Sequence, residues 1–267
     1  MEPWANIELL DLNVGGASPY DDPMLADDFE VFFAGPAANG IGQDIYSAKP
    51  DGVGGYETPV PIAAVNTGRS DTTLWVSGDG LTLLIGRTVG SPSFPELDIF
   101  ITTRPAKNVS FSDPIEIPEA QFQLINSASD EGLGALSEDG LTLFFTSNRD
   151  GDADLFMATR PTPDFTEFDT VTKLAISTDG VDEVAPKLSP DGTVLYYSVR
   201  NPAGSPTAPF DIFQAKLTKD GFANPTILTD VNDTASNEDF VPHSDNRVAV
   251  FASHRDNGIQ KIFRTSR

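Results

Sequence analysis

Short polar segments that contain Asp-Gly, each followed by a run of aliphatic and aromatic residues, recur along the chain. The clearest copies are SGDGLTLLI around Asp79, SEDGLTLFF around Asp139 and SPDGTVLYY around Asp191, and weaker copies surround Asp27 and Asp245. Asp-Gly ahead of such a run favours a tight turn between two antiparallel strands. The five aspartates follow one another at intervals of 52 to 60 residues, so five units of this size account for all 267 residues.

Two further patterns keep the same spacing and complete each unit. One is a triplet of an acidic, an aliphatic and an aromatic residue that starts at Asp44, Asp98, Asp154 and Asp211, with Lys261 in the acidic place of the last unit. The other is an aromatic residue that opens an extended segment, at Trp4, Tyr56, Phe111, Phe168 and Phe222. Each unit therefore predicts four short antiparallel strands, and a unit of this kind repeated about every 50 residues is a propeller blade. The predicted fold class is all-β, a five-bladed β-propeller.

The order of these patterns also predicts how the ring closes. The chain begins with the fourth kind of strand, Trp4 to Asn13, and ends with the third kind, Lys261 to Arg264. Neither end makes a complete blade, whereas the two together do, and sharing strands removes the open edges of an incomplete sheet. We therefore expect the N-terminal strand to complete the last blade, and residues 1–267 to form a single propeller domain.

The repeat resembles a known one over essentially the whole chain. The stretch DEGLGALSEDGLTLFFTSNRDGDADLFMATRP, together with DEVAPKLSPDGTVLYYS, is similar to the TolB-like β-propeller repeat, which runs Asp-Glu, Pro, Ser-Pro-Asp-Gly, an apolar strand, Ser-Asn-Arg and Asp-Ile-Tyr. The first and last copies depart from it, because no Gly follows Asp27 and no acidic residue precedes Ile262. The resemblance implies the propeller fold and a periplasmic or extracellular location. It does not define the activity, since this repeat serves binding proteins as well as peptidase and lyase domains.

The charge of the chain narrows the range of partners. Lys and Arg number 17 against 40 Asp and Glu, so the net charge is −23. A surface this acidic repels phosphate backbones and anionic lipids, which argues against nucleic acid as a partner. No apolar run reaches the roughly 20 residues of a membrane span, so no membrane insertion is expected. Met1-Glu2-Pro3-Trp4 does not resemble a secretory signal, so an extracytoplasmic location requires that such a signal has been removed.

Motifs for organic cofactors and common hydrolases are absent. The chain has no Cys, which excludes disulfides and thiolate chemistry. It also contains no P-loop, GxGxxG, GxSxG or HExxH sequence. We therefore expect no organic cofactor, and a monomer that takes a small-molecule or protein ligand at the mouth of the central channel.

Acidic residues precede the first strand of every unit and are predicted to form a ring on one face of the propeller. The ring contains Asp21, Asp22, Asp71, Asp130, Glu131, Asp182, Glu183, Glu238 and Asp239. Two interpretations stand side by side. In the structural one, the carboxylates pair with arginines of the following loops, Arg149, Arg200 and Arg255, or with backbone N–H groups. In the functional one they bind Ca²⁺, which prefers oxygen ligands from several loops. The ligands of this second interpretation are Asp22, Asp71, Glu131, Glu183 and Glu238.

One loop offers a second candidate calcium site. Asp150, Asp152 and Asp154 alternate with other residues around Gly151, a spacing that can place successive carboxylates around one ion. The twelve-residue calcium loop with its terminal Glu is absent. The alternative is a solvated polar turn in which Asp154 has only its role in the repeat.

The two histidines give two further hypotheses. His243 stands where other units have Ser in the turn, which favours a packing role, whereas His254 lies beside Arg255 on the acidic face and is a candidate general base. The sequence thus predicts a ligand-binding or interaction propeller of TolB-like type, with Ca²⁺ at the channel mouth. The alternative is a Ca²⁺-dependent hydrolase of lactones, esters or phosphotriesters that holds the metal in the channel.

Overall fold

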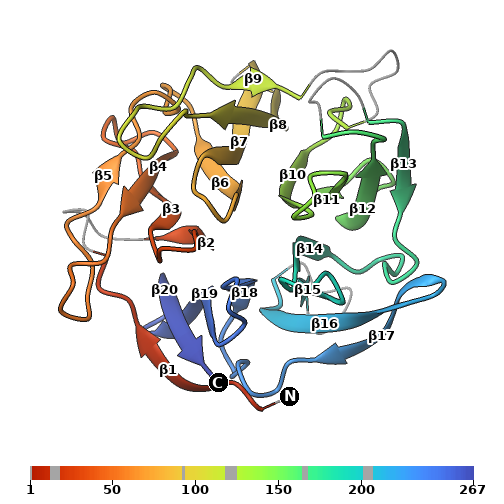
Figure 1. The fold of residues 1–267 in the computed structure, drawn as a ribbon. Coiled ribbons are helices and arrows are strands. Elements are labelled where there is room, and N and C mark those ends of the chain that lie inside the picture. Colours follow the sequence, from red (N-terminus) through yellow and green to blue (C-terminus); the bar gives the residue numbers. More distant parts are fainter. Residues whose placement is uncertain (1, 13–18, 92–93, 118–124, 164–167, 201–206) are drawn as a thin grey trace.

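The computed structural model describes residues 2–12, 19–91, 94–117, 125–163, 168–200 and 207–267. In these ranges the chain forms five antiparallel sheets of four strands, arranged in a ring about a common centre (Figure 1). The same ranges contain no helix, and hence none that is long and apolar enough to cross a membrane. The prediction of an all-β, five-bladed propeller is confirmed.

Each sheet is one blade, and its four strands are given below in order from the centre of the ring to the outer edge. Blade 1 consists of β2 (Asp21–Leu25), β3 (Val31–Pro36), β4 (Gln43–Ala48) and β5 (Val60–Pro61). Blade 2 consists of β6 (Asp71–Val76), β7 (Thr82–Ser91), β8 (Phe94–Thr103) and β9 (Ile115–Glu116). Blade 3 consists of β10 (Glu131–Leu136), β11 (Thr142–Ser147), β12 (Asp154–Thr159) and β13 (Thr170–Lys173). Blade 4 consists of β14 (Glu183–Leu188), β15 (Val194–Arg200), β16 (Phe210–Thr218) and β17 (Gly221–Ile227).

Blade 5 closes the ring with strands from both ends of the chain. It consists of β18 (Asn237–Pro242), β19 (Val248–Asp256), β20 (Ile259–Ser266) and the N-terminal strand β1 (Ala5–Leu9). β1 pairs antiparallel with β20, with Ala5 opposite Ser266 and Leu9 opposite Phe263, so the two ends of the chain meet in this blade (Figure 1). Closure by the N-terminal strand is therefore confirmed, although the strand is shorter than the expected segment from Trp4 to Asn13, whose last residue lies outside the described ranges.

The first Asp-Gly-like turn is shifted by one residue from the position that the sequence suggested. Asp28, not Asp27, occupies the place of Asp139, because its Oδ1 accepts the N–H of Glu30 as Asp139 Oδ1 accepts that of Leu141. Phe29 then takes the place of Gly140 and has a positive φ of 63°. The missing glycine had concealed this alignment.

The outer strand of blade 1 is much shorter than the aromatic lead-in pattern predicted. In blade 1 the segment expected from Tyr56 to Asn66 forms only the two-residue strand β5. Pro59 and Pro61 flank Val60, and proline has no N–H to donate to a neighbouring strand. The segment therefore follows the blade edge without extended pairing.

Apolar side chains fill the five junctions between neighbouring blades. Blades 1 and 5 share a cluster that includes Phe33, Val250 and Ile262, and each of the other junctions has a cluster of its own. Trp4 is 4% exposed and lies between blades 4 and 5, where its ring meets that of Phe240 edge-on at 5.2 Å. Burial of these faces is the main source of stability for the ring.

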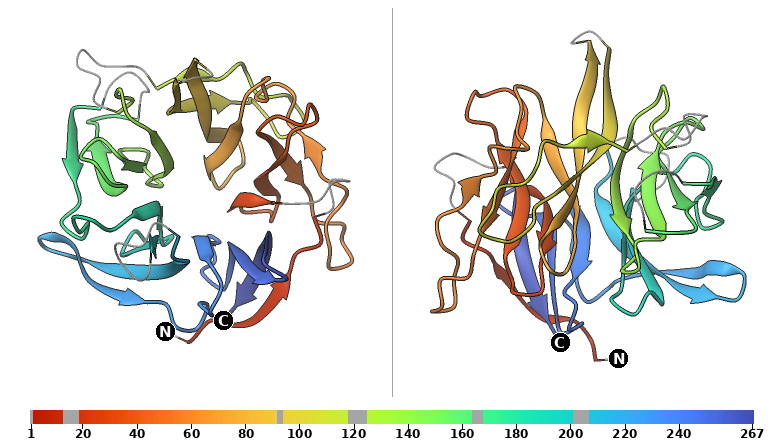
Figure 2. Two further views of the ribbon diagram at one scale, coloured as in Figure 1. Left: turned by 180° about the vertical axis from the view of Figure 1, so that it is seen from behind. Right: turned by 45° about the horizontal axis from the view of Figure 1, so that its top comes forward.

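The inner strands β2, β6, β10, β14 and β18 all start at the same face of the ring, which we call the carboxylate face. The hairpin of β7 and β8, whose strands have 10 residues each, projects beyond the other blades (Figure 2). Because Asp71 at the start of β6 lies opposite Arg87 in β7, the tip of this hairpin belongs to the carboxylate face.

Candidate functional site

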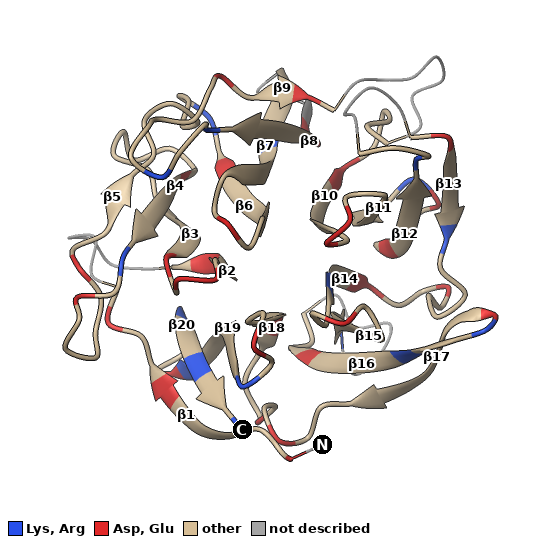
Figure 3. Ribbon diagram, viewed as in Figure 1, with Lys and Arg blue, Asp and Glu red and all other residues tan. Residues whose placement is uncertain are grey.

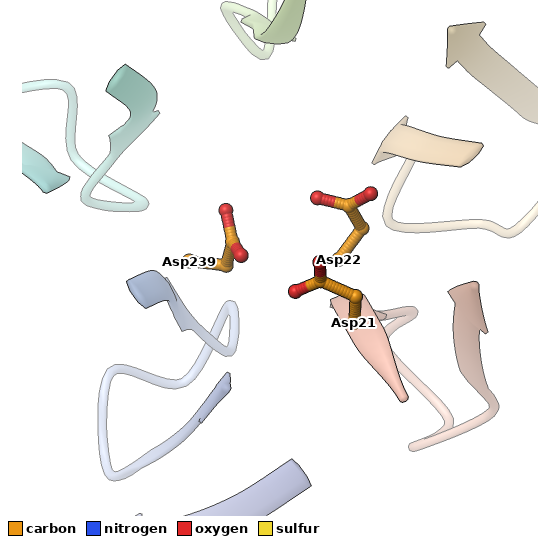
Figure 4. A group of neighbouring side chains, drawn as sticks. All are labelled: Asp21, Asp22 and Asp239. Carbon is orange, nitrogen blue, oxygen red and sulfur yellow. The ribbon is translucent and has the colours of Figure 1, made fainter. Parts of the chain in front are cut away.

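Three aspartates converge at the centre of the carboxylate face. Asp21 and Asp22 begin β2 in blade 1, and Asp239 lies in β18 in blade 5. Each offers a carboxylate oxygen, and these oxygens all lie within 4.8 Å of one another. Figure 4 shows the three side chains pointing into the same space. We call these residues the central carboxylate group.

A bulge in the inner strands places two of these aspartates. The pairing of β2 with β3 shifts between Asp21 and Met24, and that of β18 with β19 shifts between Glu238 and Val241. Asp22 and Asp239 lie within these shifts with φ values of 49° and 55°, a left-handed conformation that Asp tolerates better than most residues. Corresponding positions in blades 3 and 4 have the same conformation but carry Leu133 and Ala185. The bulge thus belongs to the repeat, whereas the acid belongs to blades 1 and 5 alone.

Two residues of the central carboxylate group are buried, Asp21 is partly buried, and the group has few hydrogen-bond donors. Asp22 is 4% exposed and Asp239 is 3% exposed. Asp21 Oδ1 accepts a hydrogen bond of 2.7 Å from Gln260 Nε2. Among the described residues, none donates a hydrogen bond to the Asp22 carboxylate. Burial, and then the charges of the neighbouring acids, raise the pKa of Asp21 and of Asp22 well above the usual range. Burial likewise raises the pKa of Asp239.

A buried lysine and a fourth acid complete the surroundings. Lys187 in β14 is 3% exposed, and its Nζ donates to the carbonyl oxygens of Leu74 (2.8 Å) and Gly134 (2.9 Å). Burial lowers the pKa of Lys187 to about 8 against the attraction of Asp239 and Asp22. Glu238, beside Asp239, has its pKa raised to about 7 by burial and by that neighbour.

Negative charge therefore exceeds positive charge at this point. Four side chains here are acidic, whereas the ammonium group of Lys187 attracts Asp22 and Asp239, and Arg200 attracts Glu238. Figure 3 shows the acidic colouring at the inner ends of β2 and β18. Carboxylate oxygens from several segments are the donor set that hard cations such as Ca²⁺ prefer, so the residues present fit a cation of this class. Within the described ranges, this is the one group of three or more Asp, Glu or His side chains with ligand atoms so close together.

The structure separates the other residues of the predicted ring from this centre. Asp71 and Glu131 are fully buried first residues of their inner strands and pair with arginines of their own blades. Asp71 Oδ1 lies 2.6 Å from Arg87 Nε, and Glu131 Oε1 lies 3.1 Å from Arg149 Nη2. Ser127 and Ser147 also donate hydroxyl hydrogen bonds to Glu131. These contacts are the ones that the structural interpretation expects, and a metal at these two residues stays a prediction without further support.

Blade 5 shows the same arrangement with a neutral residue. Asn237 occupies the place of Glu131, and its Oδ1 accepts a 2.7 Å hydrogen bond from Arg255. In blades 2, 3 and 5 the position before the bulge therefore anchors an arginine, and the charge of an acid is not required there. Glu238 follows Asn237, next to Asp239, and its Oε1 accepts a hydrogen bond from Ser236. Of the predicted ring ligands, the structure therefore places Asp22 in the central carboxylate group and Glu238 outside it.

Glu183 in blade 4 lacks the arginine that its counterparts have. Arg200 instead binds Asp182, at 2.7 Å between Nε and Oδ2, and the Glu183 carboxylate accepts only the backbone N–H of Thr178, at 3.2 and 3.3 Å, among the described residues. Burial raises the pKa of Glu183 to about 8; the Thr178 hydrogen bonds oppose this, and the charge of Asp154 adds to it. Glu183 is thus a buried carboxyl group with no arginine or lysine in direct contact among the described residues, and Lys173 acts on it only from a distance.

The three aspartates of the candidate calcium loop, Asp150, Asp152 and Asp154, have different surroundings. Asp154 is buried and pairs with Lys173 at 2.6 Å. Asp152 accepts the backbone N–H groups of Gly180 and Val181, and Asp150 is exposed. The three do not gather around one point, and calcium binding by this loop stays a prediction.

The two histidines lie apart from the central carboxylate group. His243 stacks on Phe29 with ring centroids 4.0 Å apart, as expected for a packing role at the junction of blades 5 and 1. His254 is in β19, and its Nδ1 is buried with no hydrogen-bond partner among the described residues. No contact joins it to Asp22 or Asp239, so its role as a general base stays a prediction.

Sequence reasoning missed Lys187 and gave no metal role to Asp21 and Asp239. A signal for Lys187 exists: the corresponding residues of the other blades are Met24, Trp75, Ala135 and Val241. A lysine in such an apolar series marks a buried charge, which in folded proteins requires partners.

The contrast between Glu131 and Glu183 gives a first prediction. Glu131→Gln should lower the free energy of unfolding by about 1 to 3 kcal/mol, because Arg149 loses a charged, buried acceptor. Glu183→Gln should instead stabilise the protein relative to the wild type, by an amount that grows as the pH rises from about 4.5 to about 8, since over this range the unfolded wild type loses the proton that its buried folded-state carboxyl retains. Urea unfolding of both variants across this pH range measures the two effects. Equal losses in both variants would contradict the assignment of Arg149 and Arg200 to different partners.

Comparisons with known proteins support the fold. No family model and no curated protein matches the sequence. Among solved structures, TolB from Acinetobacter baumannii is 14% identical with a TM-score of 0.57, over 93% of this chain and 54% of that one, so the chain spans about half the length of that TolB. A thermostable family-43 glycoside hydrolase is 12% identical with a TM-score of 0.62, over 96% and 91% of the two chains. The endo-arabinase from Bacteroides thetaiotaomicron is 11% identical with a TM-score of 0.58, over 97% of both. At such identities the likeness establishes the shared propeller fold.

Proposed function

We propose that the protein is an extracytoplasmic ligand-binding propeller of TolB-like type that binds Ca²⁺ through Asp21, Asp22 and Asp239. The observation that supports this most is the convergence of three carboxylates within 4.8 Å, two of them buried and the third partly buried, with Asp22 lacking any hydrogen-bond donor among the described residues. Buried acids of this kind are costly unless a positive charge compensates them. A bound cation supplies that charge.

The cation also provides a means of recognising a ligand. Ca²⁺ takes six to eight oxygen ligands, and three aspartates acting singly or in bidentate fashion leave positions for further oxygen atoms. A small molecule or a protein loop with a carboxylate or hydroxyl group would fill them from the carboxylate face. The net charge of −23 favours cations over anions near this face, so an anionic ligand would need the bound cation first.

Thermal unfolding tests the cation site directly. Millimolar Ca²⁺ should raise the melting temperature relative to Na⁺ at matched ionic strength, because a ligand at a hundredfold excess over its Kd stabilises the folded state by about 2.7 kcal/mol. Asp22→Asn should remove this increment, whereas Asp220→Asn, in an exposed turn between β16 and β17, should keep it. Identical melting temperatures in Ca²⁺ and Na⁺ for the wild type would rule the site out.

A hydrolase is the second candidate function. Carboxyl groups with raised pKa values beside a cation are suited to acid-base catalysis, and glycoside hydrolases share the fold. In this alternative Ca²⁺ polarises a carbonyl or phosphoryl oxygen of a lactone, ester or phosphotriester. Glu238 directly precedes the proposed ligand Asp239 in the sequence, and we take it as the candidate acid or base. Turnover of such substrates that a chelator abolishes, and that falls in Glu238→Gln, would favour the hydrolase over the binding module.

A further inference from the structure

The ring closes between β1, the first strand, and β20, the last one. No covalent bond joins these two strands. Within every other blade, successive strands follow one another along the chain, whereas β1 stays on β20 through backbone pairing. If β1 leaves β20, the rest of blade 5 can separate from blade 1, because β1 and the residues after it belong to the blade 1 end of the chain. We call the contact of β2 with β18, β19 and β20 the closing junction.

The central carboxylate group spans this junction. Asp21 and Asp22 lie on β2 and Asp239 lies on β18. At the position of Asp22 and Asp239, six residues before the turn aspartate, the other three blades have Thr73, Leu133 and Ala185. The acids therefore occur across the closing junction and across none of the four junctions at which the chain is continuous.

Without a cation, these acids oppose closure. Three carboxylates within 4.8 Å repel one another across the junction when ionised. Lys187 attracts Asp22 and Asp239 but makes no hydrogen bond to either, because its Nζ donates to carbonyls of β6 and β10. The Asp22 carboxylate, 4% exposed, points into the group with no hydrogen-bond donor among the described residues. A cation bound there would attract both sides of the junction at once.

We infer that the cation holds the ring closed, by bridging blades 1 and 5 at the centre while β1 on β20 joins them at the outer edge. This inference rests on the proposed function, since it needs a cation between Asp22 and Asp239. It adds that the cation regulates the conformation of the chain: removal of the cation makes release of β1 and opening of the junction more frequent, without unfolding blades 2 to 4.

Hydrogen exchange resolved by strand tests this inference on the full chain. Ca²⁺ at a hundredfold excess over its Kd should slow exchange of the β1 and β20 amides that pair with each other by about 100-fold, because their opening releases the cation. The matched control is β13 on β12, an outer strand in blade 3, whose fraying leaves the cation in place. Its amides should exchange at the same rate with and without Ca²⁺.

Two variants, with one control, separate closure from binding. The first, Asp239→Asn, should make exchange at β1 and β20 independent of Ca²⁺, whereas its control, Asp220→Asn, should not.

The second variant is a circular permutant that joins Arg267 to Met1 by a short linker, which the pairing of Ala5 with Ser266 allows, and opens the chain between Asp220 and Gly221. It should bind Ca²⁺ with the wild-type Kd in calorimetry but lose the effect on β1, because β20 and β1 are then joined covalently.

The outcomes distinguish this inference from the proposed function. Absence of calorimetric Ca²⁺ binding to the wild type would overturn both. Binding that leaves β1 and β20 exchange unchanged, or that slows β13 to the same extent, would overturn the closure role and leave the binding function in place. Should the permutant fail to fold, the comparison of Asp239→Asn with Asp220→Asn decides the same question.

Discussion

Deletion of residues 2–12 is expected to abolish stable folding of the protein. The deletion removes β1 and, with it, the buried side chains of Trp4 and Leu12, which are 4% and 2% exposed. Full burial of each is worth about 1.5 to 3 kcal/mol or more, and the partly buried Ile7 and Leu10 add to this. A domain is held folded by only about 5 to 15 kcal/mol. We therefore expect aggregation or a strongly lowered melting temperature.

Circular dichroism melting and size-exclusion chromatography measure this effect. Glu8→Ala is a suitable control, because its exposed side chain on the same strand contributes only a 3.5 Å ion pair with Arg264, and surface pairs of this kind are worth about 0 to 1 kcal/mol. The control should melt within a few degrees of the wild type. A deletion variant with the wild-type melting curve would show that β1 is not needed to close the ring.

Replacement of Lys187 by Met is expected to have the second-largest effect. It leaves the carbonyl oxygens of Leu74 and Gly134 without their donor and removes the buried positive charge that attracts Asp22 and Asp239. Removal of one member of a buried charged group typically costs about 3 to 5 kcal/mol. Met has a similar length and no charge, so the loss reports on charge and hydrogen bonding more than on packing.

Urea unfolding in the presence of a chelator measures the loss, with Lys216→Met on the exposed face of β16 as the matched control. The control should be within about 0.5 kcal/mol of the wild type, as surface substitutions usually are. Equal stability of Lys187→Met and the wild type would mean that Lys187 does not compensate the carboxylates. A cation added without chelator should recover part of the loss, since it replaces the missing charge.

The alignment of the first repeat explains why the central carboxylate group was hard to recognise. With Asp27 as the turn residue, Asp22 and Asp239 stand at different distances from their turns. With Asp28 as the turn residue, both stand six residues before it. A single missing glycine, replaced by Phe29, thus hid the equivalence of the two acids that matter most.

The acids of the predicted ring fall into two groups, which differ by only one or two positions along the inner strand. Asp71 and Glu131, at the first position, turn toward arginines of their own blade. Asp22 and Asp239, at the bulge, turn toward the centre of the ring. In a regular strand, side chains alternate between faces, and the bulge interrupts that alternation. Strand periodicity therefore predicts the wrong grouping for acids that are neighbours in sequence.

The sequence by itself determined the fold. Repeated turns, apolar runs and aromatic residues act over a few neighbouring positions, so five blades, their strand order and closure by the N-terminal strand were all predictable from local patterns. Only the tertiary structure decided the chemistry of the centre. Asp22, Lys187 and Asp239 come from three different blades, and the distances between them depend on ring closure and on the backbone bulges. The net charge of the buried centre depends on which side chains folding brings together, and no local pattern in the chain predicts it.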